Sequence, residues 1–342
     1  MHGFRRDRPG QVARVIPLKT ALLPTALAAG LAGCGGSEGS SSKTPSKTPA
    51  KTETQAKPTQ TSPRKPKVTR AAGSLPDGRI PAKALREKGA ALVLAKVTIK
   101  GKAFQMVVDT GAQESNIDVR AAKQLGLAAR GKPRTLSSIG CTKKVQPVRI
   151  AAWSAGSVKL PPTVALAQKT ESYTKSKGKI IGLLGADVIA RFGSLEIDYG
   201  TDRVVLGGSG PQGGKSFKLK SSRVKDAVII VAKVSVHGRL LPFIPDTGAS
   251  RSTIDLAVAK KLGLTTRGKP ERASAIGCGA KVQPLTLDRW KAGSTTLPKT
   301  LALGTSSLIR KKSGLAGLIG GDVFSRFGTV YFDFKHNRGV LK

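Results

Sequence analysis

The feature that most constrains the fold of this chain is an internal repeat. Three motifs recur in the same order in two parts of the sequence, at residues 109–112 and 246–249 (Asp-Thr-Gly-Ala), 139–141 and 276–278 (Ile-Gly-Cys), and 182–187 and 317–322 (Gly-Leu-Leu-Gly-Ala-Asp and Gly-Leu-Ile-Gly-Gly-Asp). The first two pairs are 137 residues apart and the third is 135 apart, so one deletion of two residues accounts for the difference. Each unit is roughly 120 residues long, which is the size of a domain and too long for a solenoid repeat. The sequence therefore predicts two similar, domain-sized halves.

Within each unit the apolar pattern indicates mostly strands, with one or two short helices. Apolar residues fill 91–99 and 103–108 on either side of a Lys-Gly-Lys turn, and 228–236 before a His-Gly turn, which predicts a β-hairpin in each unit. Asp118 and Asp255 are expected to cap a short helix after each Asp-Thr-Gly-Ala quartet. A second short helix is expected near the aspartate that ends the later glycine motif. The predicted fold class is mainly β.

The N-terminal residues have the pattern of a secretory signal. A basic stretch that includes Arg5 and Arg6 precedes an apolar run of about a dozen residues, which is shorter than the ~20 needed to span a bilayer. Small residues lead directly to Cys34, an order that resembles a bacterial lipoprotein signal. The resemblance implies that residues 1–33 are removed, that Cys34 is lipidated, and that the protein is anchored at the extracytoplasmic face of a bacterial cell membrane. An ordinary signal with an unrelated cysteine is the alternative.

Residues 34–84 are expected to form a disordered tether. They are rich in Ser, Thr, Lys and Pro and contain few large apolar side chains, so the segment cannot bury enough surface to offset the entropy of ordering. A second flexible segment, rich in glycine, is expected at 208–217. These two segments place the first half at 85–207 and the second half at 218–342.

Basic side chains far outnumber acidic ones. The chain has 59 Lys and Arg against 20 Asp and Glu, a net charge of +39, which favours polyanionic partners. Binding of single-stranded nucleic acid usually needs aromatic side chains among the basic ones, and only 4% of the residues are aromatic. We therefore expect no nucleic-acid partner, and instead a solvated basic surface or electrostatic contact with an anionic cell envelope.

The paired Asp109 and Asp246 carry the predicted chemistry. Each follows a predicted strand and precedes Thr-Gly, so that the strand fixes the carboxylate and the glycine lets backbone amides approach it. Two carboxylates brought to about 3 Å share one proton, because both cannot ionise at that distance. The ionised group can then take a proton from an attacking water while the other donates to a carbonyl oxygen. We assign neither role to one aspartate, since the pair titrates as a unit.

These motifs resemble those of the retropepsin-like aspartic proteases over most of residues 87–342. The likeness rests on the two Asp-Thr-Gly-Ala quartets, on the apolar-apolar-Gly elements at 183–185 and 318–320, and on the spacing between them. It implies two closed-barrel halves related by a pseudo-two-fold axis, with a substrate cleft between them and a hairpin flap after each quartet. Because both halves lie in one chain, the resemblance implies a monomer with an internal pseudo-dimer.

The resemblance also implies a role for each motif residue. It makes Asp109 and Asp246 catalytic, Thr110, Gly111, Thr247 and Gly248 supporting, and Ala112, Ala249, Ile139, Gly140, Ile276 and Gly277 substrate-binding. The substrate is then a polypeptide, and neither a cofactor nor a metal is expected.

Cys141 and Cys278 occupy equivalent places in the two predicted flaps. Flap tips of this family meet over the cleft, and secreted chains live in oxidising surroundings, so the resemblance suggests a Cys141–Cys278 disulfide that joins the flaps. Two free thiols are the alternative. Catalysis by a Cys-His or a Ser-His-Asp set is disfavoured, because His237 and His336 are the only histidines after Cys34.

The two quartets are followed by different residues, which leaves alternatives open. Residues 113–115 are Gln-Glu-Ser and residues 250–252 are Ser-Arg-Ser, and Pro245 precedes the second aspartate where an apolar strand residue is usual. The sequence favours an aspartic endopeptidase anchored at the cell surface. A non-catalytic pseudoprotease that binds peptide or cell-wall polymer is one alternative, and half-units that each dimerise with another chain are a second.

Overall fold

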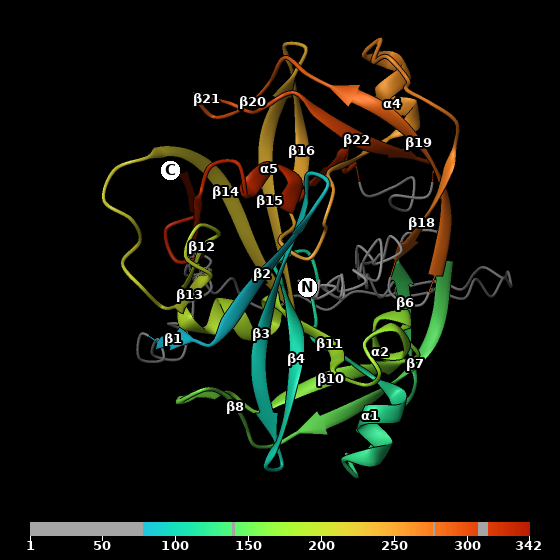
Figure 1. Cartoon of the computed structure of the whole chain (residues 1–342), viewed down its shortest axis with the longest axis vertical. Coiled ribbons are helices and arrows are strands. Elements are labelled where there is room, and N and C mark those ends of the chain that lie inside the picture. Colours follow the sequence, from blue (N-terminus) through green and yellow to red (C-terminus); the bar gives the residue numbers. More distant parts are fainter. Residues whose placement is uncertain (1–77, 139–140, 276–277, 307–313) are drawn as a thin grey trace, which may run out of the picture.

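The computed structural model describes residues 78–138, 141–275, 278–306 and 314–342. Within these residues the fold is mainly β, and every helix is short. Figure 1 shows two halves, with the first repeat in the lower part and the second repeat in the upper part. Strands from both halves meet at the left-hand side of this view.

The same order of elements recurs in the two halves. The first contains β1 (Gly78–Ile80), β2 (Ala82–Glu87), β3 (Ala90–Ile99), β4 (Lys102–Asp109), β5 (Asn116–Asp118), α1 (Val119–Gln124), β6 (Arg134–Ser138), β7 (Cys141–Ile150), β8 (Trp153–Ala155), β9 (Val158–Leu160), β10 (Thr163–Gln168), α2 (Glu171–Lys175), β11 (Ile180–Gly185), α3 (Ala186–Ile189), a 3-10 turn (Ala190–Phe192), β12 (Ser194–Asp198) and β13 (Arg203–Leu206). The second contains β14 (Lys215–Val224), β15 (Ala227–Val236), β16 (Arg239–Pro245), β17 (Thr253–Asp255), α4 (Leu256–Lys261), β18 (Glu271–Ala275), β19 (Cys278–Leu287), β20 (Trp290–Ala292), β21 (Thr295–Thr296), β22 (Thr300–Thr305), β23 (Gly317–Ile319), α5 (Gly321–Phe324), β24 (Thr329–Asp333) and β25 (Arg338–Leu341).

The predicted hairpins and helices are confirmed. β3 pairs with β4 and β15 pairs with β16, both antiparallel, around the expected turns. Asp118 and Asp255 cap α1 and α4, because each aspartate is in extended conformation and its carboxylate accepts backbone N–H groups of the first helical turn. The second short helices, α3 and α5, begin beside the expected aspartates.

The expected closed barrels are not found in the described residues. The sheet of the first half runs β6-β7-β10-β5-β11-β4-β3-β8-β9, and its two edge strands do not pair with each other. Closing a barrel requires that first and last strands pair. Here β12 and β13 lie in the other sheet, beside β24 and β25 of the second half, so they are not available to close the sheet of the first half.

That second sheet is shared by the two halves. Its order begins β1-β13-β12-β24-β25-β14 and continues into β15 and β16 of the second half, so strands of the first repeat pair directly with strands of the second. β12 and β24 are antiparallel, and Glu196 pairs with Tyr331, which lies 135 residues later. The later glycine motifs of the two repeats, at 182–187 and 317–322, are separated by the same number of residues. Equivalent residues therefore pair with each other, which places a pseudo-two-fold axis through this point of the sheet.

Each half also reaches into the other with a hairpin. Ala91 in β3 donates its N–H to the carbonyl of Ser250, at 3.2 Å, and Val228 in β15 donates to the carbonyl of Gln113, at 3.0 Å. These bonds are equivalent under the 137-residue offset, and both acceptors directly follow an Asp-Thr-Gly-Ala quartet. The exchange ties the loop that holds each aspartate to the opposite half.

Two predicted boundaries are wrong. The tether at 34–84 and the link at 208–217 were expected to be flexible, but β1 begins at Gly78, β2 begins at Ala82 and β14 begins at Lys215. β1 pairs with β13 and β14 pairs with β25, so these polar segments are strands because distant strands supply their hydrogen-bond partners. The halves therefore begin seven and three residues earlier than the predicted 85 and 218. Cys34 and residues 1–77 lie outside the described residues.

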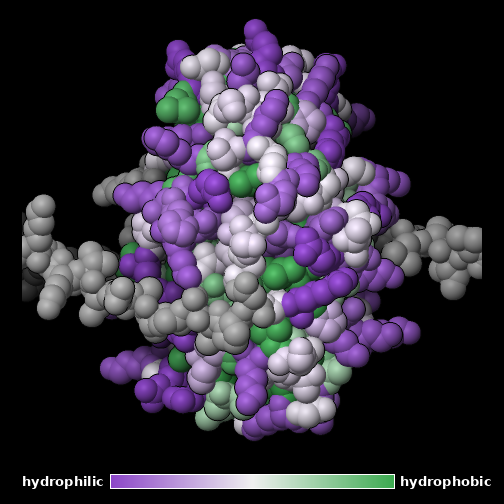
Figure 2. Space-filling view, turned by 90° about the vertical axis from the view of Figure 1, so that its left-hand side faces the viewer, coloured by the Kyte–Doolittle hydropathy of each residue, from purple (hydrophilic) through white to green (hydrophobic). Residues whose placement is uncertain are grey.

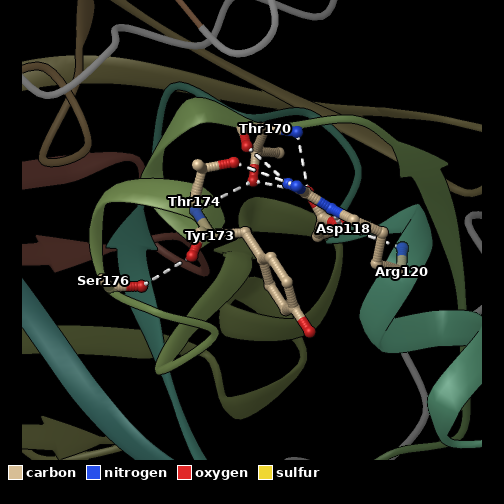
Figure 3. Close-up of polar contacts among 6 residues, drawn as sticks. All are labelled: Asp118, Arg120, Thr170, Tyr173, Thr174 and Ser176. Carbon is tan, nitrogen blue, oxygen red and sulfur yellow. Dashed lines mark hydrogen bonds and ion pairs between the residues drawn. The ribbon is translucent and has the colours of Figure 1, made fainter.

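Helix α2 was not predicted, and it is attached to α1 by a polar network around the buried carboxylate of Asp118 (Figure 3). Asp118 accepts hydrogen bonds from the Thr170 N–H at 2.7 Å and from Arg120 Nε at 2.8 Å. Arg120 also donates to Thr174, and its guanidinium lies 4.5 Å from the ring centroid of Tyr173. Burial alone would raise the pKa of Asp118, but the hydrogen bonds from Arg120 and Thr170 outweigh it and hold the pKa below its usual range.

The surface over the shared sheet is mostly hydrophilic. Figure 2 shows this face, where purple side chains predominate and smaller green areas lie towards its centre. Among the described residues, no helix has the length and apolar character needed to cross a membrane.

The network around Asp118 gives a stability prediction with a matched control. Asp118→Ala removes the cap of α1 and leaves Arg120 and Thr170 without their buried partner, so we expect a loss of about 3 kcal/mol in unfolding free energy. Asp255→Ala removes only the α4 cap, with bonds to Ala257 and Val258, and should cost about 1 kcal/mol. Urea unfolding of both variants measures the difference. Equal losses would contradict a structural role for the network.

Candidate active site

The structure brings Asp109 and Asp246 together from positions 137 residues apart. Asp109 ends β4, which is paired in parallel with β11, and Asp246 follows β16, which is paired in parallel with β23. Both aspartates are fully buried. Each carboxyl group lies against the quartet glycine of the opposite half, and neither Oδ2 atom has a hydrogen-bond partner among the described residues.

Backbone amides hold the inner oxygen of each carboxyl group. Asp109 Oδ1 accepts hydrogen bonds from the N–H groups of Gly111 and Ala112, at 2.9 and 2.8 Å. Asp246 Oδ1 accepts the equivalent bonds from residues 248 and 249, at 3.0 and 2.8 Å. With Oδ1 fixed in this way, the Oδ2 atoms are the pair left for chemistry.

The two quartet glycines allow the carboxyl groups to approach each other. A Cβ atom on Gly111 would overlap the carboxyl group of Asp246, and a Cβ on Gly248 would overlap that of Asp109. Any larger residue at either position would therefore separate the pair. The sequence predicted glycine here because backbone amides must approach the aspartate of the same half. In the structure, each glycine also leaves room for the carboxyl group of the opposite half.

The quartet threonines connect the two halves beneath the carboxyl groups. Thr110 Oγ1 donates to the carbonyl of Pro245 at 2.7 Å, and Thr247 Oγ1 donates to the carbonyl of Val108 at 2.8 Å. Each hydroxyl also accepts the backbone N–H of the other threonine, at 3.1 Å in both cases. Because the bond at Pro245 uses only its carbonyl, the missing N–H of proline leaves this arrangement intact.

The environment keeps a proton on the pair. Burial is the largest cause that raises the pKa of both Asp109 and Asp246, and the charge of Asp109 raises the pKa of Asp246 further. An ionised Asp109 therefore opposes ionisation of Asp246, and the pair retains a proton. The arrangement can therefore supply one proton acceptor and one donor together.

The other predicted site residues have different outcomes. Ala112 and Ala249 are fully buried, and their amides bind the carboxylates, so contact with substrate stays a prediction. The expected flap hairpins are present as β6–β7 and β18–β19. Their tips, with Ile139, Gly140, Ile276 and Gly277, lie outside the described residues.

The proposed disulfide also remains a prediction. Cys141 and Cys278 are the first residues of β7 and β19, at equivalent places in the two hairpins. Their side chains lie outside the part of the chain that the structure describes.

Sequence reasoning missed a buried pair behind each aspartate. Ser115 donates both its N–H and its hydroxyl to Asp187 Oδ1, at 2.8 and 2.7 Å, and Ser252 donates both to Asp322 Oδ1, at 2.9 and 2.8 Å. Each pair links the loop after the quartet to the helix after the glycine element. The signal was available, because serine and aspartate recur at these positions in both repeats. Burial is the main cause that raises the pKa of Asp187 to about 7 and that of Asp322 to about 6.

The residues that differ after the two quartets form an inverted ion pair. In the first half Arg134 Nη1 donates to Glu114 Oε1 at 2.7 Å, and in the second half Arg251 Nη1 donates to Glu271 Oε1 at 2.9 Å. Positions 114 and 251 are equivalent, as are 134 and 271, so both charges are exchanged together. The ion pair is kept in each half, whereas the sign of charge beside the quartet is reversed. No group of three potential metal-ligating side chains is found in the described residues.

The raised pKa of Asp187 predicts how stability depends on pH. The folded state holds this proton up to about pH 7, so the carboxyl group stabilises the fold fully below about pH 4 and loses that contribution as pH rises through 7. Asp187→Asn removes this loss. We expect the unfolding free energy of the variant, relative to the unchanged protein, to rise between pH 5 and pH 7 and to level off by pH 8 in urea titrations.

Asp118→Asn is the control for that measurement. Burial raises the pKa of Asp118, but its hydrogen bonds with Arg120 and Thr170 outweigh burial and hold the pKa below the usual range. Neither partner changes its charge between pH 5 and pH 8, so this substitution should produce no such rise there. A difference for Asp187→Asn that stays constant across this range would contradict the prediction.

The comparisons with known proteins agree with the repeat. The sequence pattern of the aspartyl protease family matches residues 95–188 and 231–323. None of the curated proteins matches this chain. Among solved structures, the crystal structure of edgp is similar with 9% sequence identity and a TM-score of 0.43, over 77% of this chain and 94% of that chain.

This TM-score is too low to support a conclusion about the chain, so the family assignment rests on the sequence match. Its two segments fall one on each repeat and contain Asp109 and Asp246 at corresponding places. Together the segments cover more than half of the 342 residues, so the chain belongs to the aspartyl protease family, in its retropepsin-like form.

Proposed function

We propose that this protein is an aspartic endopeptidase that hydrolyses peptide bonds with water activated between Asp109 and Asp246. The observation that carries the proposal is the pair of fully buried carboxyl groups, one from each half, each of which lies against the quartet glycine of the opposite half. A lone buried carboxyl group has no partner of this kind. The paired arrangement matches the requirement for simultaneous proton acceptance and donation.

The proposed reaction begins with a water molecule between the two Oδ2 atoms. The ionised carboxylate takes a proton from this water as its oxygen attacks the carbonyl carbon of the peptide bond, while the protonated carboxyl group donates to the carbonyl oxygen. Breakdown of the tetrahedral species then transfers a proton to the leaving nitrogen and restores the shared proton. Thr110, Gly111, Thr247 and Gly248 support these steps, because they fix the separation and the orientation of the two groups.

The non-catalytic alternative is less well supported. A pseudoprotease is expected to lose the geometry in one half, whereas both halves here retain the threonine bonds, the two amide bonds to each carboxylate and the close glycine. Pro245 and the different residues after the quartets leave these contacts intact. The shared sheet likewise favours a monomer with an internal pseudo-dimer over half-units that pair with other chains.

The location of the protein is a proposal that rests on sequence. Lipidation of Cys34 would hold the protein at the extracytoplasmic face of a bacterial membrane, with the following residues as a tether. The net charge of +39 supports contact with an anionic cell envelope.

The proposed function predicts that both aspartates are required. We expect Asp109→Asn and Asp246→Asn each to lower kcat for a mixed peptide library by at least about a hundredfold, because each removes one of the two proton-transfer groups. Asp288→Asn, which changes an exposed aspartate of the second half, should leave kcat unchanged. Liquid chromatography with mass spectrometry of the products measures cleavage.

A mixing experiment separates an intramolecular dyad from one formed between chains. Asp109→Asn and Asp246→Asn chains together should remain inactive, because each chain has one defective dyad. Recovery of activity on mixing would support pairing between chains. Activity that survives both single substitutions would remove the dyad from the mechanism.

A further inference from the structure

Two buried side chains of the first half each carry a polar atom without a partner. Asn116 is 1% exposed and Gln168 is 4% exposed. Neither Asn116 Oδ1 nor Gln168 Nε2 has a hydrogen-bond partner among the described residues. A buried polar atom that makes no hydrogen bond is costly, so such atoms in a folded protein need an explanation. The reaction between the two carboxyl groups uses neither of them.

The strand register places these two side chains on one face of the sheet. β5 is parallel to β10, and Asn116 is opposite Leu166. Two residues further along both strands, Asp118 is opposite Gln168. Successive side chains of a strand point to opposite faces of a sheet, so residues two apart share a face. Asn116 and Gln168 therefore stand on the same face of neighbouring strands.

This face is turned towards the flap hairpin of the first half, β6–β7 (Figure 1). Ile117, the next residue of β5, points the other way and belongs to the main core. Leu166, opposite Asn116, instead packs with Leu136 of β6 and Val145 of β7. The unpartnered atoms therefore lie on the flap side of the sheet, where the proposed reaction requires a substrate peptide.

The other neighbour of Asn116 connects it with the dyad. On β11, Asn116 is opposite Leu183, which belongs to the cluster that contains Ala112. Two residues later, Gly185 is opposite Asp109 at the end of β4. Strands are about 4.8 Å apart and rise about 3.3 Å per residue, so the backbones of Asn116 and Asp109 are about 12 Å apart. An extended peptide that passes through the dyad covers this distance in about four residues.

Hydrogen bonds on both sides of the unpartnered atoms hold β5 and β10 in register. The carbonyl of Ser115 accepts the N–H of Leu166 at 3.0 Å, which joins the two strands beside Asn116. At the other end, Asp118 accepts the N–H of Thr170 at 2.7 Å. The backbone that carries both atoms is therefore fixed before a ligand arrives, which lowers the ordering cost of binding.

The two unpartnered atoms have complementary hydrogen-bonding roles. Asn116 Oδ1 accepts hydrogen bonds, and Gln168 Nε2 donates them. A group that satisfies both must supply a donor and an acceptor on separate atoms, because the two partners stand on different strands. The carboxamide of asparagine or glutamine does so with its NH2 and its carbonyl oxygen, whereas a carboxylate lacks the donor and an ammonium group lacks the acceptor. A hydroxyl has both functions on a single atom.

The second half does not repeat this arrangement. Under the 137-residue offset, Thr253 is equivalent to Asn116 and Thr305 is equivalent to Gln168. Among the described residues, Thr253 Oγ1 is a buried atom without a partner, and no such atom is found on Thr305. One hydroxyl does not replace a separate donor and acceptor, so the arrangement that fits a carboxamide belongs to the first half.

We propose that Asn116 and Gln168 are specificity-determining residues that bind the carboxamide of an asparagine or glutamine side chain on one side of the scissile bond. The NH2 of this carboxamide donates to Asn116 Oδ1, and its carbonyl oxygen accepts from Gln168 Nε2. The inference rests on the proposed function, and it names the side chain that the polypeptide substrate carries near the cleaved bond.

A peptide series tests the preference. The peptides share one cleavable sequence and carry asparagine, glutamine, glutamate, methionine or serine at one position, which is varied within about four residues of the cleaved bond on either side. Glutamate and methionine resemble glutamine in size, but glutamate lacks the donor and methionine lacks both strong hydrogen-bonding functions. Cleavage is measured as kcat/KM with the unchanged chain. Binding is measured by fluorescence anisotropy with the full chain carrying Asp246→Asn, or Asp109→Asn if the former does not fold.

Three variants separate the two polar atoms from their surroundings. Asn116→Leu and Gln168→Met each replace one polar end with an apolar group of similar size. Thr253→Val is the matched control, because it removes the equivalent unpartnered atom of the second half in the same way. Urea unfolding establishes that each variant is folded, and either of the first two suffices for the test.

We expect the better of the two carboxamide peptides to exceed the glutamate and methionine peptides at least about tenfold in kcat/KM, at a position on one side of the cleaved bond. Asn116→Leu and Gln168→Met should each reduce this preference to below about twofold and still cleave the methionine peptide, whereas Thr253→Val should keep the preference.

No carboxamide preference at any position, the same preference on both sides, a stronger preference for serine, or an equal effect of Thr253→Val would overturn the inference. Cleavage without a carboxamide preference would leave the proposed function standing and remove this inference. A carboxamide preference in binding without any cleavage would do the reverse.

Discussion

The structure depends on the reciprocal hydrogen bonds between Thr110 and Thr247. These two hydroxyls bind the backbone of the opposite half on both sides of the pseudo-two-fold axis, and both side chains are fully buried. Hydrogen bonds shielded from water are rigid and costly to break, so they fix how far apart the halves can lie. The separation of the carboxyl groups of Asp109 and Asp246 follows from them, since each aspartate directly precedes its threonine.

Burying two carboxyl groups in contact opposes folding, and the rest of the architecture offsets that cost. The 15-stranded sheet that contains strands of both repeats joins the halves on one side, and the exchanged hairpins join each half to the loop beside the opposite aspartate. The Ser115–Asp187 and Ser252–Asp322 pairs hold those loops from behind. Burial opposes folding because it removes two carboxyl groups from water. The same burial raises the pKa values of Asp109 and Asp246, so that the pair retains a proton for the proposed chemistry.

Duplication has conserved the centre of the molecule and changed its flanks. The contacts at the quartets are nearly identical in the two halves, whereas the ion pairs at Glu114–Arg134 and Arg251–Glu271 have exchanged their signs. A symmetric centre suits a reaction that needs two equivalent carboxyl groups. The inverted pairs are therefore places where the two halves, alike at the centre, differ in the sign of charge beside the quartets.

The sequence by itself determined the duplication, the hairpins, the capped helices and the two aspartates, because these follow from local spacing and residue type. It led to wrong boundaries at 85 and 218 and to a closed barrel, since the partners of β1, β14 and the closing strands lie far along the chain. Tertiary structure alone decided that Gly111 lies against the opposite carboxylate and that residues 114 and 134 form a pair. Those features depend on how two halves pack, and packing distances are not encoded in the spacing of any single motif.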